Sequence, residues 1–68
     1  MLGPQEVRRL RRLVERGADG RATTAQKREL REFLGASSDK VWELDWDGVQ
    51  EVGRFVLRIN EGVAFEAA

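Results

Sequence analysis

The side chains able to do chemistry in this 68-residue chain are carboxylates, guanidinium groups, hydroxyls and two indoles, because it contains no His, Cys or Tyr. Without these three residue types, the usual pairs of a general base and a nucleophile cannot be assembled. A zinc site also lacks its usual Cys and His ligands. The hydroxyls of Thr23, Thr24, Ser37 and Ser38 stand where helix caps are expected. We therefore expect a non-enzymatic protein with no catalytic residue, no cofactor and no metal.

One acidic run resembles part of a calcium-binding loop. Glu43, Asp45, Asp47 and Gly48 occupy the first, third, fifth and sixth positions of such a pattern. The twelfth position requires a bidentate Glu, but here it is Arg54. The run is therefore interpreted as an acidic turn rather than a calcium site.

Charge is balanced overall but divided between the two halves of the chain. The 12 basic and 12 acidic residues give a formal net charge of zero. Residues 1–36 contain nine Arg or Lys and five acids, whereas residues 37–68 contain three and seven, giving +4 and −4. Such an asymmetry indicates either a basic face for an anionic partner or two faces that attract each other, within the fold or between chains.

The length and hydropathy of the chain indicate one small domain, covering residues 1–68. A chain of this size buries only about 60% of the surface that its unfolded form exposes, so its stability is marginal. No apolar run approaches the roughly 20 residues that span a bilayer, and residues 1–6 do not have the order of a secretory signal. We expect a soluble cytoplasmic protein that does not contact the membrane.

Helical signals dominate the first two thirds of the chain. Pro4 suits the first turn of a helix, and apolar residues follow at helical spacing until the glycines and Asp of 17–20 break the pattern. Thr23 and Gln26 form a capping box, so a second helix is expected at about 24–34. Gly35 should end it in the left-handed conformation. A third helix should then run from about 38 to 46.

The last third allows two interpretations. Valine and isoleucine recur from Val49 to Val63 at intervals of three and four, which is typical of a helix, with Phe55 at the edge of the stripe. Alternation around a possible loop at 60–62 instead suits a β-hairpin. We favour the helix, because the hairpin leaves Val49 without a role. The predicted fold is all-α, with three to four short helices and a central helix-turn-helix. The alternative is an α+β fold with a hairpin at about 54–66.

The stretch from Leu30 to Leu44 resembles the helix-turn-helix of Cro- and repressor-type DNA-binding proteins. The apolar and glycine positions of that family are matched by Leu30, Leu34, Gly35, Ala36, Val41 and Leu44. The run Phe-Leu-Gly-Ala-Ser-Ser at 33–38 is similar to the family's turn. The run Asp-Trp-Asp-Gly at 45–48 is similar to the acid and glycine that often follow its second helix. The resemblance implies that Val41 and Leu44 fold back onto Leu30 and Leu34.

The same resemblance implies double-stranded DNA as the partner. The second helix of the motif enters the major groove and the preceding helix holds phosphates. The base-reading positions would be occupied by Ser38, Asp39, Trp42 and Glu43, with Lys40 as the only cation on that helix. The phosphate-binding positions would be occupied by Gln26, Lys27 and Arg28. Affinity for DNA comes largely from Lys and Arg, so a monomer with this single lysine would bind weakly. A homodimer formed through the last helix is therefore implied.

Protein binding is the alternative function. Trp42 and Trp46 are four residues apart and are expected on one face of the third helix, either in the core or exposed. If exposed, they would form a hot spot for a basic protein partner, rimmed by Glu43, Asp45 and Asp47. Both functions describe a small regulatory protein, either a DNA-binding transcription regulator or a protein-binding inhibitor or adaptor, of the kind that phages or accessory genes encode.

Overall fold

The computed structural model describes residues 2–36 and 39–67, with the side chains of the last five of these left aside. The elements in chain order are α1 (Pro4–Ala18), α2 (Thr24–Gly35), the 3-10 helix η1 (Asp39–Glu43) and α3 (Trp46–Ala67). The described residues contain helices and no strand, which confirms the all-α fold. The alternative hairpin at about 54–66 is wrong, because α3 covers that whole range.

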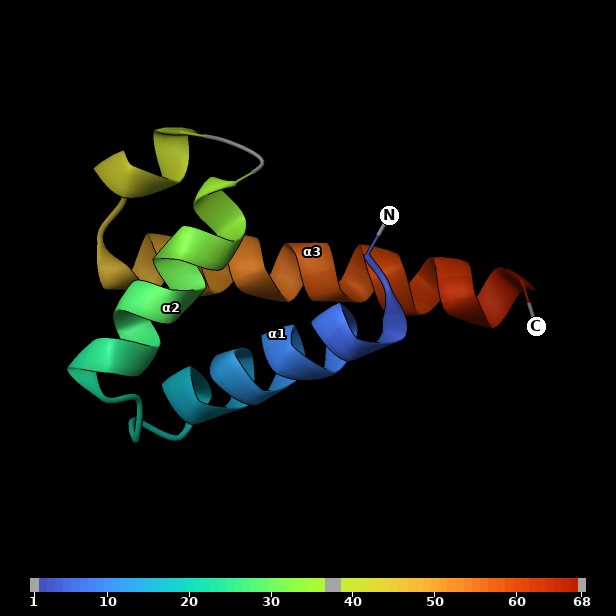
Figure 1. The fold of residues 1–68 in the computed structure, drawn as a ribbon, viewed down its shortest axis with the longest axis horizontal. Coiled ribbons are helices and arrows are strands. Elements are labelled where there is room, and N and C mark those ends of the chain that lie inside the picture. The colour runs from blue at the N-terminus through green and yellow to red at the C-terminus, as the bar shows by residue number, and fades with distance from the viewer. Residues whose placement is uncertain (1, 37–38, 68) are drawn as a thin grey trace.

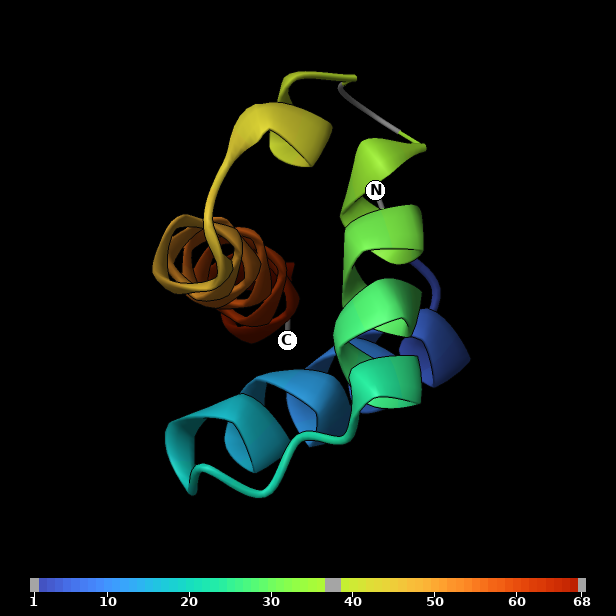
Figure 2. The same ribbon diagram turned by 90° about the vertical axis from the view of Figure 1, so that its left-hand side faces the viewer.

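The three α-helices enclose one core, with α3 as the longest rod. In Figure 1, α1 runs below α3, and α2 crosses steeply over the N-terminal part of α3, starting beside the end of α1. The helix η1 lies beyond the far end of α2. Seen from the side, α2 stands between α1 and η1, and α3 is viewed almost along its axis (Figure 2). The C-terminal part of α3 extends past the other helices.

Local signals explain where the helices begin. Gly3 is the N-cap of α1 and Pro4 its first residue. At α2, the Gln26 amide donates to the Thr23 hydroxyl over 3.1 Å, and the Gln26 side chain accepts from the Thr23 amide over 2.9 Å. At α3, the Asp45 carboxylate accepts a hydrogen bond from the Gly48 amide over 2.8 Å. The caps of α2 and α3 satisfy amides that the first helical turn leaves unpaired, whereas Gly3 makes no side-chain cap and its carbonyl accepts from the Val7 amide over 3.0 Å.

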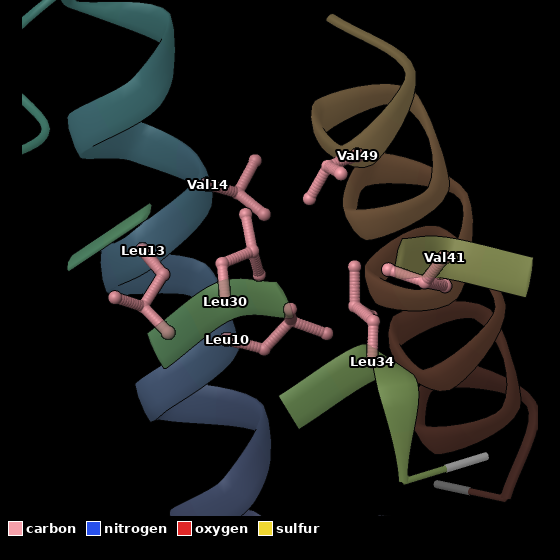
Figure 3. Packing of buried hydrophobic residues seen from close by; sticks show 7 residues of the cluster. All are labelled: Leu10, Leu13, Val14, Leu30, Leu34, Val41 and Val49. Atoms are coloured by element: carbon pink, nitrogen blue, oxygen red, sulfur yellow. The ribbon is translucent and has the colours of Figure 1, made fainter. Parts of the chain in front are cut away.

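The core is small and entirely aliphatic. Its buried side chains come from all four elements and point toward one another (Figure 3): Leu10, Leu13, Val14, Leu30, Leu34, Val41 and Val49. Partly buried residues, including Phe33 and Trp46, pack around this cluster. In the helical stripe expected in α1, Leu10, Leu13 and Val14 are confirmed as core, whereas Val7 is only partly buried. The positions Leu30, Leu34 and Val41 are also confirmed as core.

Two expectations about the turn after α2 are wrong. Gly35 does not end the helix in the left-handed conformation: it is the last residue of α2, and the only positive φ among the described residues belongs to Gly20. The third helix does not run from 38 to 46 either. It is a five-residue 3-10 helix that ends at Glu43, and Trp46 already begins α3. Ser37 and Ser38 lie outside the described residues.

Leu44 also departs from its predicted position. It was expected to fold back onto Leu30 and Leu34, but 37% of its surface is exposed. It lies in the short connection between η1 and α3, where Asp45 begins the cap of α3. The early end of η1 turns the chain before Leu44 can reach the core, and Val41 is the residue of this segment that is buried.

Candidate functional site

An exposed tryptophan marks the corner formed by η1 and the end of α2. Trp42 is 52% exposed, yet one part of its indole lies directly against α2. A Cβ atom built on Gly35 would lie 2.5 Å from the indole Nε1, which no side chain could tolerate without displacing the ring. Gly35 therefore allows the indole to rest on the helix backbone with its remaining surface open to solvent.

Hydrogen bonds fix the backbone around this corner. The Arg31 guanidinium donates to the Leu44 carbonyl over 3.3 Å, which ties α2 to the connection after η1. The Leu44 amide donates to the Val41 carbonyl over 3.2 Å and closes the 3-10 turn. Since Val41 is in the core, the corner is anchored from both sides. Trp42 is thus presented by a fixed backbone.

The surroundings of Trp42 are acidic. The exposed carboxylates of this corner belong to Asp39, Glu43 and Asp45, the only cation on η1 is Lys40, and the Arg31 guanidinium reaches the corner from α2. None of these five charged groups is in an ion pair within the part of the chain that the structure describes. We call the exposed surface of residues 39–45 the acidic corner, and the net charge of these residues is −2, since three acids outnumber one lysine. Asp47, predicted as part of the same surface, instead lines a hollow with Gly17, Lys27 and Trp46.

The second tryptophan has a different environment. Trp46 begins α3, is partly buried against the core, and has the Lys27 ammonium 5.4 Å from the centre of its ring. A Cβ atom on Gly17 would lie 3.2 Å from its indole, so α1 also approaches it closely. The prediction that the two tryptophans share one helical face is therefore wrong. They belong to different elements, because η1 ends between them.

The residues predicted to hold phosphates are divided among different tasks. Gln26 is committed to the capping box of α2, and Lys27 lies over Trp46. Arg28 is exposed on α2. Three of the predicted base-reading residues, Asp39, Trp42 and Glu43, lie with Lys40 on η1, which is five residues long. The fourth, Ser38, is outside the described residues.

The sequence indicates a basic face in the first half of the chain but does not specify which arginines of α1 form it. Arg9 pairs with Glu29 over 2.7 Å and Arg11 pairs with Glu61 over 2.5 Å, so these two arginines face the neighbouring helices. Arg8, Arg12 and Arg16 are exposed and form no ion pair with the described residues. Their spacing of four residues places them along one side of α1. The sequence signal for this basic face is the spacing of the arginines, on the side of α1 opposite its core leucines.

An apolar groove is the other feature that sequence reasoning missed. It is about 630 Å³ in volume and lies where α1, the end of α2, η1 and the middle of α3 meet. Its apolar lining includes Phe33, Val41, Val52, Phe55 and Val56. Phe55 stands at its edge with 61% of its surface exposed. The only sequence signal was the position of Phe55 at the margin of the valine stripe.

The described residues offer neither a metal site nor a membrane-spanning helix. Within them, no group of three or more acidic side chains is arranged to hold a metal ion. None of the helices there combines the length and the hydropathy that crossing a bilayer requires.

Comparison with known proteins adds no family assignment. The chain matches no protein-family model, and no similarity to a curated protein or to a solved structure reaches significance. The function is therefore inferred from the geometry of these surfaces.

Proposed function

We propose that this protein is a small, non-enzymatic regulatory protein that binds a basic protein partner through the acidic corner. The observation that carries this proposal is Trp42, which is 52% exposed and held against Gly35 on a segment with three exposed carboxylates. Tryptophan is among the residues that most often dominate the binding energy of interfaces. Its fixed backbone keeps the entropy lost on binding low. Leu44, two residues further along the chain and 37% exposed, offers a second apolar contact.

The charge of the corner indicates the kind of partner. Three carboxylates on the segment that carries an exposed indole attract Lys and Arg side chains over a distance and repel acidic surfaces. A cationic, amphipathic segment would place its apolar residues on Trp42 and Leu44 and its basic residues toward Glu43 and Asp45. Such binding should weaken with added salt, because the carboxylates are exposed and therefore screened.

The test compares the two tryptophans. Labelled Lys- and Arg-rich amphipathic peptides serve as the probe, and their binding is measured by fluorescence anisotropy at low and high salt. We expect Trp42→Ala to reduce affinity about tenfold or more, which corresponds to a hot-spot residue, while circular dichroism and the Tm stay unchanged. Trp46→Ala should lower the Tm, because its ring packs on the core.

Charge variants supply the matched control. Glu43→Lys, at the acidic corner, should weaken peptide binding, whereas Glu15→Lys, on exposed α1, should leave it unchanged. Equal binding by wild type and Trp42→Ala would contradict the proposal, as would loss of the fold in Trp42→Ala.

DNA binding is the second candidate, favoured by the basic face of α1. Arg8, Arg12 and Arg16 are exposed, unpaired within the described residues and regularly spaced, and Arg28 adds another exposed cation on α2. These groups can contact phosphates, which position a protein on a duplex without reading its sequence. The acidic residues of η1 oppose close approach of that segment to phosphates. We infer that any DNA contact would be made through α1 rather than through η1.

Duplex titrations over a range of salt concentrations test this second candidate. Three phosphate contacts predict a log–log salt slope of about −3. Arg12→Glu should weaken binding strongly, whereas Lys40→Ala on η1 should have little effect; Lys27→Glu should weaken it only if α2 also contacts phosphates. Absence of binding at low salt would end the DNA-binding candidate.

A further inference from the structure

The apolar groove and the side chains beside it form a surface with a hollow and a projection. The hollow, of about 630 Å³, has Phe33, Val41, Val52 and Val56 among its lining residues. Phe55 projects at its edge on α3, and Ile59 lies one turn further along the helix. They are 61% and 47% exposed, among the most exposed large apolar side chains of the described residues. Water therefore covers a continuous apolar patch.

We propose that a second copy of this chain covers this patch in a two-fold symmetric dimer, with Phe55 of each copy seated in the groove of the other. A two-fold interface uses the same patch on both subunits, so the patch must be complementary to itself. A projecting phenyl ring next to an apolar hollow meets this requirement. The symmetry axis then passes beside Phe55. The groove of one copy covers the exposed face of α3, which carries Phe55, in the other copy.

The charges around the patch fit this arrangement. Glu6, Glu32 and Arg9 line the groove on the side of α1 and α2, and the charge of Arg9 is already paired with Glu29. Arg58 is exposed on α3, about 60° around the helix from Phe55 and on the side away from Val52. Glu6, Glu32 and Arg58 form no ion pair with the described residues. The two-fold axis brings Arg58 of one copy toward Glu32 of the other, and the symmetry repeats this contact. Because the net charge of the chain is zero, two copies do not repel each other overall.

A dimer interface would cover a sizeable share of so small a chain. A standard interface buries about 800 Å² on each partner, which is roughly a sixth of the 5058 Å² that this chain exposes. The 22-residue helix α3 is about 33 Å long, so its outer face and the groove together offer an elongated contact surface. Burying it would add apolar area to a core of seven side chains.

Sedimentation equilibrium of the full chain, from micromolar to submillimolar concentration, tests the proposal. We expect wild type to approach twice the 7.7 kDa mass of the chain. Phe55→Asp should remain folded, because the side chain is exposed, and should stay at the monomer mass throughout. Arg12→Ala on the outer side of α1 is the control and should dimerise as wild type does. A wild type that stays monomeric at submillimolar concentration, or a dimeric Phe55→Asp variant, overturns the proposal.

A charge exchange tests the predicted pairing. Arg58→Glu and Glu32→Arg should each weaken the homodimer, because each places like charges opposite one another twice. An equimolar mixture of the two variants should form a heterodimer, since both contacts then regain opposite charges. The double variant Glu32→Arg/Arg58→Glu should dimerise again. If the mixture stays as monomeric as its components, the copies do not meet in this orientation and the two-fold arrangement is wrong.

Discussion

Gly53 shows how one residue sets the distance between helices. It is buried in α3, and a Cβ atom there would lie 3.0 Å from Cγ2 of Val14 and 3.7 Å from Cδ1 of Leu30. A glycine inside a helix costs about 1 kcal/mol relative to alanine. Here that cost allows α3 to pass close to both α1 and α2. Gly35 acts similarly at the acidic corner, where it lets the Trp42 indole rest on α2.

Replacing Gly53 should therefore damage the core. Gly53→Leu places a large side chain against Val14 and Leu30, and overpacking of this kind typically costs about 1–3 kcal/mol. We expect the urea midpoint to fall accordingly. Gly62→Ala is the matched control in the same helix, where nothing lies within 4 Å of the added atom; it should raise stability by up to about 1 kcal/mol. A Gly53→Leu variant as stable as wild type would show that the helices are less closely packed than described.

At the scale of elements, α2 connects every other part of the fold. Its Leu30 and Leu34 are core residues, its Arg31 bonds the Leu44 carbonyl, and its Lys27 covers Trp46. Glu29 and Phe33 both contact Arg9 of α1. The position at which α2 begins is therefore important, and it is set by the capping box of Thr23 and Gln26.

Removing that cap should destabilise the whole protein. Thr23→Ala deletes the hydroxyl that accepts from the Gln26 amide, and loss of such a cap costs about 1 kcal/mol. Thermal unfolding followed by circular dichroism should show a lower Tm. Thr24→Ala, at the first helical position, keeps the cap and should unfold like wild type. Equal losses in the two variants would mean that the hydroxyl of Thr23 contributes nothing beyond its position.

At the scale of the whole molecule, charged side chains lie mainly at the surface rather than in the core. Among the described residues, the ion pairs that join different helices are Arg9–Glu29 and Arg11–Glu61. Their side chains are about half exposed, and such pairs contribute little to stability. The core depends instead on aliphatic burial. Exposed charged groups thus remain available to partners on the basic side of α1, at the acidic corner, and around the groove beside Phe55, which adjoins that corner at η1 and the end of α2.

The sequence by itself predicted the elements that depend on nearby residues. Pro4, the capping box at Thr23 and the apolar periods of α1 and α3 each act within a few residues, so the helices and most of the core could be inferred from spacing. The choice of a helix over a hairpin for the last third followed from the role that it gave Val49, which is fully buried. The sequence did not determine the function, because the same residues, Trp42 and Glu43, suited both a DNA and a protein partner.

Only the tertiary structure decided how the segment after α2 is arranged. Whether residues 39–43 form an α-helix or a 3-10 turn depends on Val41 reaching the core, on Arg31 bonding Leu44, and on Asp45 capping α3. These contacts join residues of different elements, and no local period encodes them. They also place Trp42 outside and Trp46 against the core. The groove beside Phe55 arises for the same reason: a cavity is a property of the space between elements, which spacing along one helix does not describe.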